Sequence, residues 1–147
     1  MIRQAAILLL LTLAAAAGTH FFHPKRPVWY LSQEPLRDDE ITLALVNEKW
    51  AGNVLWIDAR IESRFALGHV PGAILLNDQN FHDKLADHLE ALQKASVEQK
   101  AVVVYCDAEA CQASRKIREE LVQTLGLENV FILKGGWRGW QSEAGRR

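Results

Sequence analysis

Short apolar runs alternate with helical patterns along the chain from Asp38 onward. Four of the runs contain no charged residue and are bounded by polar residues or glycine. They are Val54–Ile57, Ala73–Leu76, Ala101–Tyr105 and Val130–Leu133. Strands that are apolar on both faces are typical of parallel sheets covered by helices on both sides. We therefore expect four buried parallel strands, with Ile41–Leu43 as a further short strand.

Apolar residues between these runs recur at helical spacing. One such set is Phe81, Leu85, Leu89 and Leu92; a second is Ile117, Leu121 and Leu125, which stops at Gly126; Ala44–Trp50 reads as a shorter helix ending near Gly52. Strands that alternate with helices predict an α/β fold, a small, mainly parallel sheet flanked by helices on both faces. In such sheets the ligand site lies beyond the carboxyl ends of the strands. Asp58 and Cys106 both follow strands, so we expect them at this edge.

The first part of the chain has a different pattern. Ala5–Gly18 is apolar or small except for Thr12, and Arg3 precedes it, as in an export signal or membrane anchor. We expect a hydrophobic helix in residues 1–23, as a signal peptide or single membrane anchor. A linker with three prolines follows in 24–37, then one domain in 38–143 and a flexible tail in 144–147. This organisation predicts an extracytoplasmic, periplasmic location, membrane-anchored or secreted.

Composition narrows the possible partners. The chain has 147 residues, of which 49% are hydrophobic, enough to build one domain core. Its formal net charge of -1 argues against a nucleic-acid partner, which usually requires a basic face. The two cysteines, Cys106 and Cys111, are too close in sequence for the disulfide framework of a small secreted protein. They lack a second ligand pair, so we expect neither a metal nor another cofactor.

Cys106 is the candidate reactive residue. It directly follows the most apolar run, and the next helix is expected to begin at about Gln112. The N–H groups and dipole at a helix N-terminus favour a thiolate and bind anions. A buried cysteine that serves only as a small core residue fits the same position. Placement alone leaves both interpretations open.

Four motifs, in order, resemble those of the rhodanese-like domain. They are Leu55–Arg60, which contains Asp-x-Arg; Gly68–Ala73, which reads Gly-His-Val-Pro-Gly-Ala; Val103–Cys106; and Leu133–Trp137, which contains Gly-Gly-Trp. The resemblance implies a sulfurtransferase fold in which Cys106 takes sulfur from a small donor as a persulfide and passes it to a thiol acceptor. It also implies largely architectural roles for Asp58, Arg60 and His69. Asp58 would organise the strand end, and Arg60 would be its partner or an anion contact.

The loop after Cys106 departs from the family pattern Cys-x-x-Gly-x-Arg. Its residues are Asp107, Ala108, Glu109, Ala110 and Cys111, so Glu109 stands at the glycine position and Cys111 at the arginine position. Without the arginine, the loop loses its attraction for an anion such as thiosulfate. The carboxylates of Asp107 and Glu109 repel anions and disfavour a thiolate. The Cys-x4-Cys form resembles a subgroup of exported or membrane-linked bacterial members.

Cys111 leaves three interpretations open. It could resolve a persulfide or sulfenate on Cys106, lock the loop through a static disulfide, or be a small buried helix residue. The functions left open are a sulfurtransferase or persulfide carrier that uses Cys106, a thiol–disulfide protein that uses Cys106 and Cys111 as a redox couple, and a non-catalytic module that binds an envelope partner of unknown identity. A cysteine phosphatase is disfavoured, because no arginine closes the loop to hold a phosphate.

Overall fold

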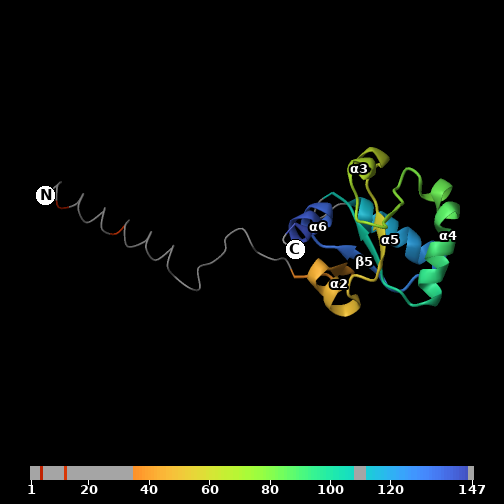
Figure 1. Cartoon of the computed structure of the whole chain (residues 1–147), viewed down its shortest axis with the longest axis horizontal. Helices are drawn as coiled ribbons and strands as arrows, with labels where there is room; N and C mark the ends of the chain where they lie inside the picture. Colours follow the sequence, from red (N-terminus) through yellow and green to blue (C-terminus); the bar gives the residue numbers. More distant parts are fainter. Residues whose placement is uncertain (1–3, 5–11, 13–34, 108–111, 146–147) are drawn as a thin grey trace. The chain divides into compact units, whose positions relative to one another are not determined.

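Two compact units make up the computed structural model, Met1–Pro35 and Leu36–Arg147, and the structure describes residues 4, 12, 35–107 and 112–145 (Figure 1). The predicted N-terminal helix, apart from Gln4 and Thr12, lies outside the described residues, as do the predicted linker before Pro35 and the tail after Gly145. Among the described residues, no helix has both the length and the apolar character needed to cross a membrane.

A five-stranded parallel sheet forms the centre of the second unit. Its strands are β1 (Glu40–Ile41), β2 (Leu55–Asp58), β3 (Ile74–Leu75), β4 (Val102–Tyr105) and β5 (Val130–Leu133), in the order β1-β5-β4-β2-β3. Every neighbouring pair is parallel, which confirms the expected sheet type. The central strand β4 pairs with β2 along its whole length, from Val102 beside Leu55 to Tyr105 beside Asp58.

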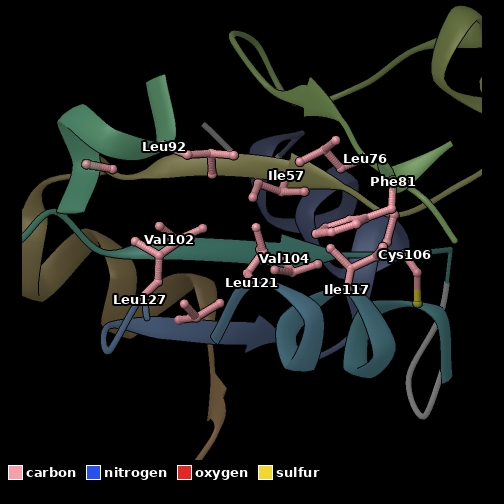
Figure 2. Packing of buried hydrophobic residues seen from close by; sticks show 13 residues of the cluster. Ile57, Leu76, Phe81, Leu92, Val102, Val104, Cys106, Ile117, Leu121 and Leu127 are labelled. Atoms are coloured by element: carbon pink, nitrogen blue, oxygen red, sulfur yellow. The ribbon is translucent and has the colours of Figure 1, made fainter. Parts of the chain in front are cut away.

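Helices cover both faces of this sheet, as the apolar strands predict. The helices are α2 (Leu43–Trp50), α3 (Glu62–Leu67), α4 (Phe81–Val97), α5 (Gln112–Leu125) and α6 (Gly136–Ala144). One core cluster joins the sheet to α4 and α5, through residues such as Leu92, Ile117 and Leu121 (Figure 2). A second cluster joins the opposite face to α2 and α6, through residues such as Val46 and Trp137.

Side chains alternate between these two clusters along β4, because successive residues of a strand point to opposite faces. Val104 and Cys106 belong to the cluster beneath α4 and α5, whereas Val103 and Tyr105 belong to the cluster beneath α2 and α6. Figure 2 shows Cys106 at the end of β4, on the side of α5. The side chains of Tyr105 and Cys106, at the carboxyl end of the central strand, therefore pack on opposite faces of the sheet.

The prediction for the first strand was wrong by one or two residues. The expected strand Ile41–Leu43 is Glu40–Ile41, and Leu43 already belongs to α2. Thr42 ends the strand because its side chain accepts a hydrogen bond from the Leu45 N–H at 3.2 Å and caps the helix.

Candidate active site

Cys106 lies at the junction of three elements. Its side chain is buried, with 3% of the residue exposed, and the Ser114 hydroxyl in the first turn of α5 lies 3.7 Å from its sulfur. The backbone carbonyl of Cys106 accepts a hydrogen bond of 2.7 Å from the Trp137 N–H in the first turn of α6. The end of β4 is thus held by one helix on each face, and the thiol is directed to the N-terminal end of α5.

Asp58 and Arg60 form a buried ion pair beside this turn. Arg60 Nη2 lies 2.7 Å from Asp58 Oδ2, and the two side chains are 3% and 0% exposed. Arg60 Nε donates to both Asp58 oxygens, at 2.9 and 3.1 Å, and the Arg60 backbone N–H donates to Oδ1 at 2.9 Å. The Asp-x-Arg motif therefore folds back on itself and closes the end of β2.

The rest of the Arg60 guanidinium connects the loops around Cys106. Nη2 donates to the Gly68 carbonyl at 2.7 Å, and the guanidinium carbon lies 4.7 Å from the centre of the Trp137 ring. Nη1 lies 3.6 Å from Oδ1 of Asp107, whose side chain is half exposed. Burial lowers the pKa of Arg60, but the hydrogen bond and charge of Asp58 more than offset this and raise it, so Arg60 stays charged.

Tyr105 supports the opposite face of the same turn. The Val70 N–H donates to its hydroxyl at 3.0 Å, and its ring stacks against Trp137 with 6.2 Å between ring centres. Burial, followed by interaction with Asp58, raises the pKa of Tyr105 well above its ordinary value. Tyr105 therefore remains a neutral packing and hydrogen-bonding residue at physiological pH.

His69 makes its described contacts on the surface. Its ring stacks on Phe65 with 3.8 Å between centres, and its Nδ1 lies 3.0 Å from the Phe65 carbonyl. These contacts join the start of the Gly-His-Val-Pro-Gly-Ala motif to α3. They fix the shape of the loop after β2 and direct the imidazole to solvent-exposed surroundings.

Part of the predicted loop lies outside the described residues, namely Ala108, Glu109, Ala110 and Cys111. The structure thus brings together Cys106, Asp107, Asp58 and Arg60 at one edge of the sheet. In the described part of the chain, no group of three or more His, Cys, Asp or Glu residues is arranged to hold a metal ion.

The sequence analysis missed three residues that shape this site: Ser114, Tyr105 and Asn77. Asn77 is buried, donates from Nδ2 to the Arg60 carbonyl at 3.0 Å, and accepts from the Gln79 and Asn80 N–H groups through Oδ1. A polar residue directly after an apolar strand was a usable signal for Asn77, as it was for Asp58. For Ser114, the sequence contained no signal other than its position in the first helical turn after the loop.

An open hollow of about 640 Å³ lies against the first turns of α5. Its lining includes Gln112, Ala113, Arg115, Lys116, Arg37 and Asp78. Two of the cations are paired, Lys116 with Asp78 at 3.9 Å and Arg115 with Glu40 at 3.7 Å. Its lining does not include Cys106, Asp107, Asp58 or Arg60, so the hollow is a separate feature from the cysteine turn.

Comparison with known proteins agrees with this geometry. The family model of the rhodanese-like domain matches residues 43–143. A tRNA uridine(34) hydroxylase of Buchnera aphidicola is 26% identical over 141 residues, covering 83% of this chain and 43% of that protein's length.

Solved structures resemble the fold at lower identity. The rhodanese-like domain of the Anabaena protein Alr3790 has a TM-score of 0.52 and 23% identity, covering 72% of this chain and 75% of the other. The human single-domain sulfurtransferase TSTD1 has a TM-score of 0.51 and 19% identity, covering 72% and 97%. With the four motifs, the buried Asp58–Arg60 pair and Cys106 at the end of β4, the family match over residues 43–143 shows that this chain belongs to the rhodanese-like domain family.

Proposed function

We propose that this protein is a sulfurtransferase or persulfide carrier that acts through Cys106. The observation that carries the proposal is the position of this thiol at the carboxyl end of the central strand, 3.7 Å from the Ser114 hydroxyl at the start of α5. A hydroxyl and the N-terminal end of a helix both stabilise a negatively charged sulfur. The membership of the chain in the rhodanese-like family supports the same assignment.

The chemistry proceeds by two exchanges at sulfur. The Cys106 thiolate attacks the outer sulfur of a donor, a new S–S bond forms, and the donor's own bond to that sulfur breaks. The leaving group, sulfite when the donor is thiosulfate, departs with the electron pair. An acceptor thiolate then attacks the terminal sulfur of the persulfide and returns Cys106 as a thiolate. Both steps conserve electrons, so neither requires an added oxidant.

Intact mass spectrometry tests this proposal directly. After incubation with a sulfur donor, the wild-type chain should gain the mass of one sulfur, and cyanide should remove it as thiocyanate. Cys106→Ser should fold but fail to load, since serine is close in size to the buried cysteine. Cys111→Ser is the matched control and should still load. Loading that survives Cys106→Ser, or a wild type that no donor loads, would refute the proposal.

A thiol–disulfide function is the second candidate, favoured by the direction of the Cys106 side chain. The sulfur contacts Ser114 in the first turn of α5, and Cys111 immediately precedes that helix in sequence. In this mechanism the two thiols reduce a disulfide of a partner, losing two electrons and two protons as their own disulfide forms. Cys111→Ser should then trap a mixed disulfide on Cys106. Failure of both thiols to react with an alkylating reagent after mild reduction would exclude this function.

We also propose that residues 1–23 export or anchor the domain outside the cytoplasm, in the periplasm. The support is the apolar run after Arg3. Residues 1–37 fused to a reporter that folds only in an oxidising compartment should give activity, and deletion of residues 5–18 should abolish it. The small donor and thiol acceptor would then be periplasmic molecules. A net charge of -1 supports partners other than nucleic acid.

A further inference from the structure

We propose that Asp107 determines which sulfur donors Cys106 accepts, by occupying the edge of Arg60 that an anionic donor would otherwise use. The inference rests on the proposed persulfide chemistry of Cys106. It predicts selection against donors that carry a separate anionic group, such as thiosulfate with its sulfonate. Persulfides whose leaving group carries no further charge are the favoured class.

The hydrogen bonds of Arg60 leave one edge directed to the cysteine turn. Nε and Nη2 are used by Asp58 and the Gly68 carbonyl, and the flat faces of the guanidinium lie near the rings of Trp137 and Tyr105. Among the described residues, the contact of Nη1 is with Asp107, the residue directly after Cys106. Through this edge the buried cation reaches the residue that directly follows Cys106 in the chain.

The contact between Nη1 and Asp107 is an ion pair without hydrogen-bond geometry. Its length of 3.6 Å exceeds the range of N–H···O hydrogen bonds, and the Asp107 side chain is half exposed. Asp107 is thus held by charge and remains accessible to solvent. An entering anion would have to displace this carboxylate or share the Nη1 protons with it.

The local charge balance gives the direction of the effect. Asp58 neutralises Arg60 at 2.7 Å, so within this group of three described side chains the carboxylate of Asp107, the residue after Cys106, is one negative charge in excess. That charge repels the sulfonate of thiosulfate more than it affects a persulfide whose leaving thiolate carries no second anionic group. Removing it also frees Nη1, a guanidinium edge suited to hold an oxyanion.

The test compares two donors with and without this carboxylate. We would measure the initial rate of sulfur loading on Cys106 with thiosulfate and with the persulfide of 2-mercaptoethanol, in low salt. Asp107→Asn should raise the ratio of the rate with thiosulfate to the rate with this persulfide, which has no sulfonate, by roughly two- to fivefold, the effect expected of a half-exposed ion pair. Asp107→Glu, which retains the charge, should keep a ratio close to that of the wild type.

Glu98→Gln is the matched control. Glu98 is also half exposed and paired with a cation, Lys94 at 3.9 Å, but it precedes β4 and lies at the other end of that strand. Its ratio should equal that of the wild type, and the gain in Asp107→Asn should shrink in 0.5 M salt. An unchanged ratio in Asp107→Asn, or an equal rise in Glu98→Gln, would overturn the inference while loading on Cys106 still stands. Absence of loading with either donor would instead refute the persulfide function itself.

Discussion

The buried Asp58–Arg60 pair offers a sharp test of what holds the active-site turn. Asp58→Asn keeps the shape of the side chain but removes its charge. Among the described residues, Arg60 is then left buried with Asp107, at 3.6 Å, as its remaining ion-pair partner. Removing one partner of a buried ion pair typically costs about 3–5 kcal/mol, because the remaining charge is uncompensated. The Asp58 oxygens also accept four contacts from Arg60, so we expect the upper half of that range.

Urea unfolding monitored by tryptophan fluorescence would measure this loss. A domain of this size has a total stability of about 5–15 kcal/mol, so the midpoint should fall by a large fraction of its value. Glu98→Gln, in an exposed ion pair 3.9 Å long, should cost less than about 0.5 kcal/mol and serves as the control.

A double variant separates charge from packing. Arg60→Met leaves the buried Asp58 carboxylate uncompensated, at a cost of about 3–5 kcal/mol, and leaves the Gly68 carbonyl without the Nη2 donor, at a further cost of about 1–3 kcal/mol. Combined with Asp58→Asn, it should be less destabilising than the sum of the two single changes, because no uncompensated charge remains. Additive losses, or an Asp58→Asn variant as stable as Glu98→Gln, would refute the electrostatic explanation.

Three further predictions concern neighbouring residues. An unfolded tyrosine ionises near pH 10, whereas burial keeps Tyr105 of the folded protein neutral. The free energy of unfolding should therefore fall as the pH rises through about 10, by up to about 1.4 kcal/mol per pH unit. Urea titrations at pH 9 and 11 should show that this fall is smaller in Tyr105→Phe. Ser114→Ala should slow sulfur loading at neutral pH by about two- to tenfold, because the Cys106 sulfur loses a hydroxyl 3.7 Å away. The rate should recover at higher pH, and Ser114→Thr should retain most of it. Equal loading rates in Ser114→Ala and the wild type at every pH would contradict this role. Gly135→Ala should lower the free energy of unfolding in urea by about 1–3 kcal/mol, and by more than Gly126→Ala. Both glycines have a positive φ, but a Cβ at position 135 would also meet Gly139 Cα at 3.3 Å. Equal losses in the two variants would mean that backbone strain alone determines the cost.

The strands of the fold were predictable because they are buried on both faces. The run Val130–Leu133 is the strand β5 without change, and the other runs extend no more than two residues beyond their strands. Helices α3 and α6 were not predicted from periodicity, whereas the similarly short α2 was. α3 has six residues and buries none of them, so it has no apolar stripe, and α6 begins after Gly135 in a left-handed conformation that reads as a turn.

The candidate site was predictable in its residues and less so in its environment. The strand-end rule brought Asp58 and Cys106 to one edge, where the structure has them. It left open whether Arg60 lies at the surface, because burial of a charge depends on a partner and on rings from distant segments. Tyr105 and Trp137 supply those rings, and no local pattern shows which face of the sheet either one covers.

The parallel topology explains why changes in one loop can alter the chemistry without loss of the fold. β5, β4 and β2 are neighbours, so the residues that follow them, Trp137, Cys106 and Arg60, meet at one edge. The contacts among these residues are made by the backbone, by the Asp58–Arg60 pair and by the Arg60 guanidinium on the Trp137 ring, and none requires the side chain of Asp107. Asp107 is half exposed and touches Arg60 only through charge, so substitutions there change the electrostatic field at the sulfur at little cost in stability. We therefore expect the scaffold to fix the position of Cys106, and the proposed donor preference to depend on the first loop residue, Asp107.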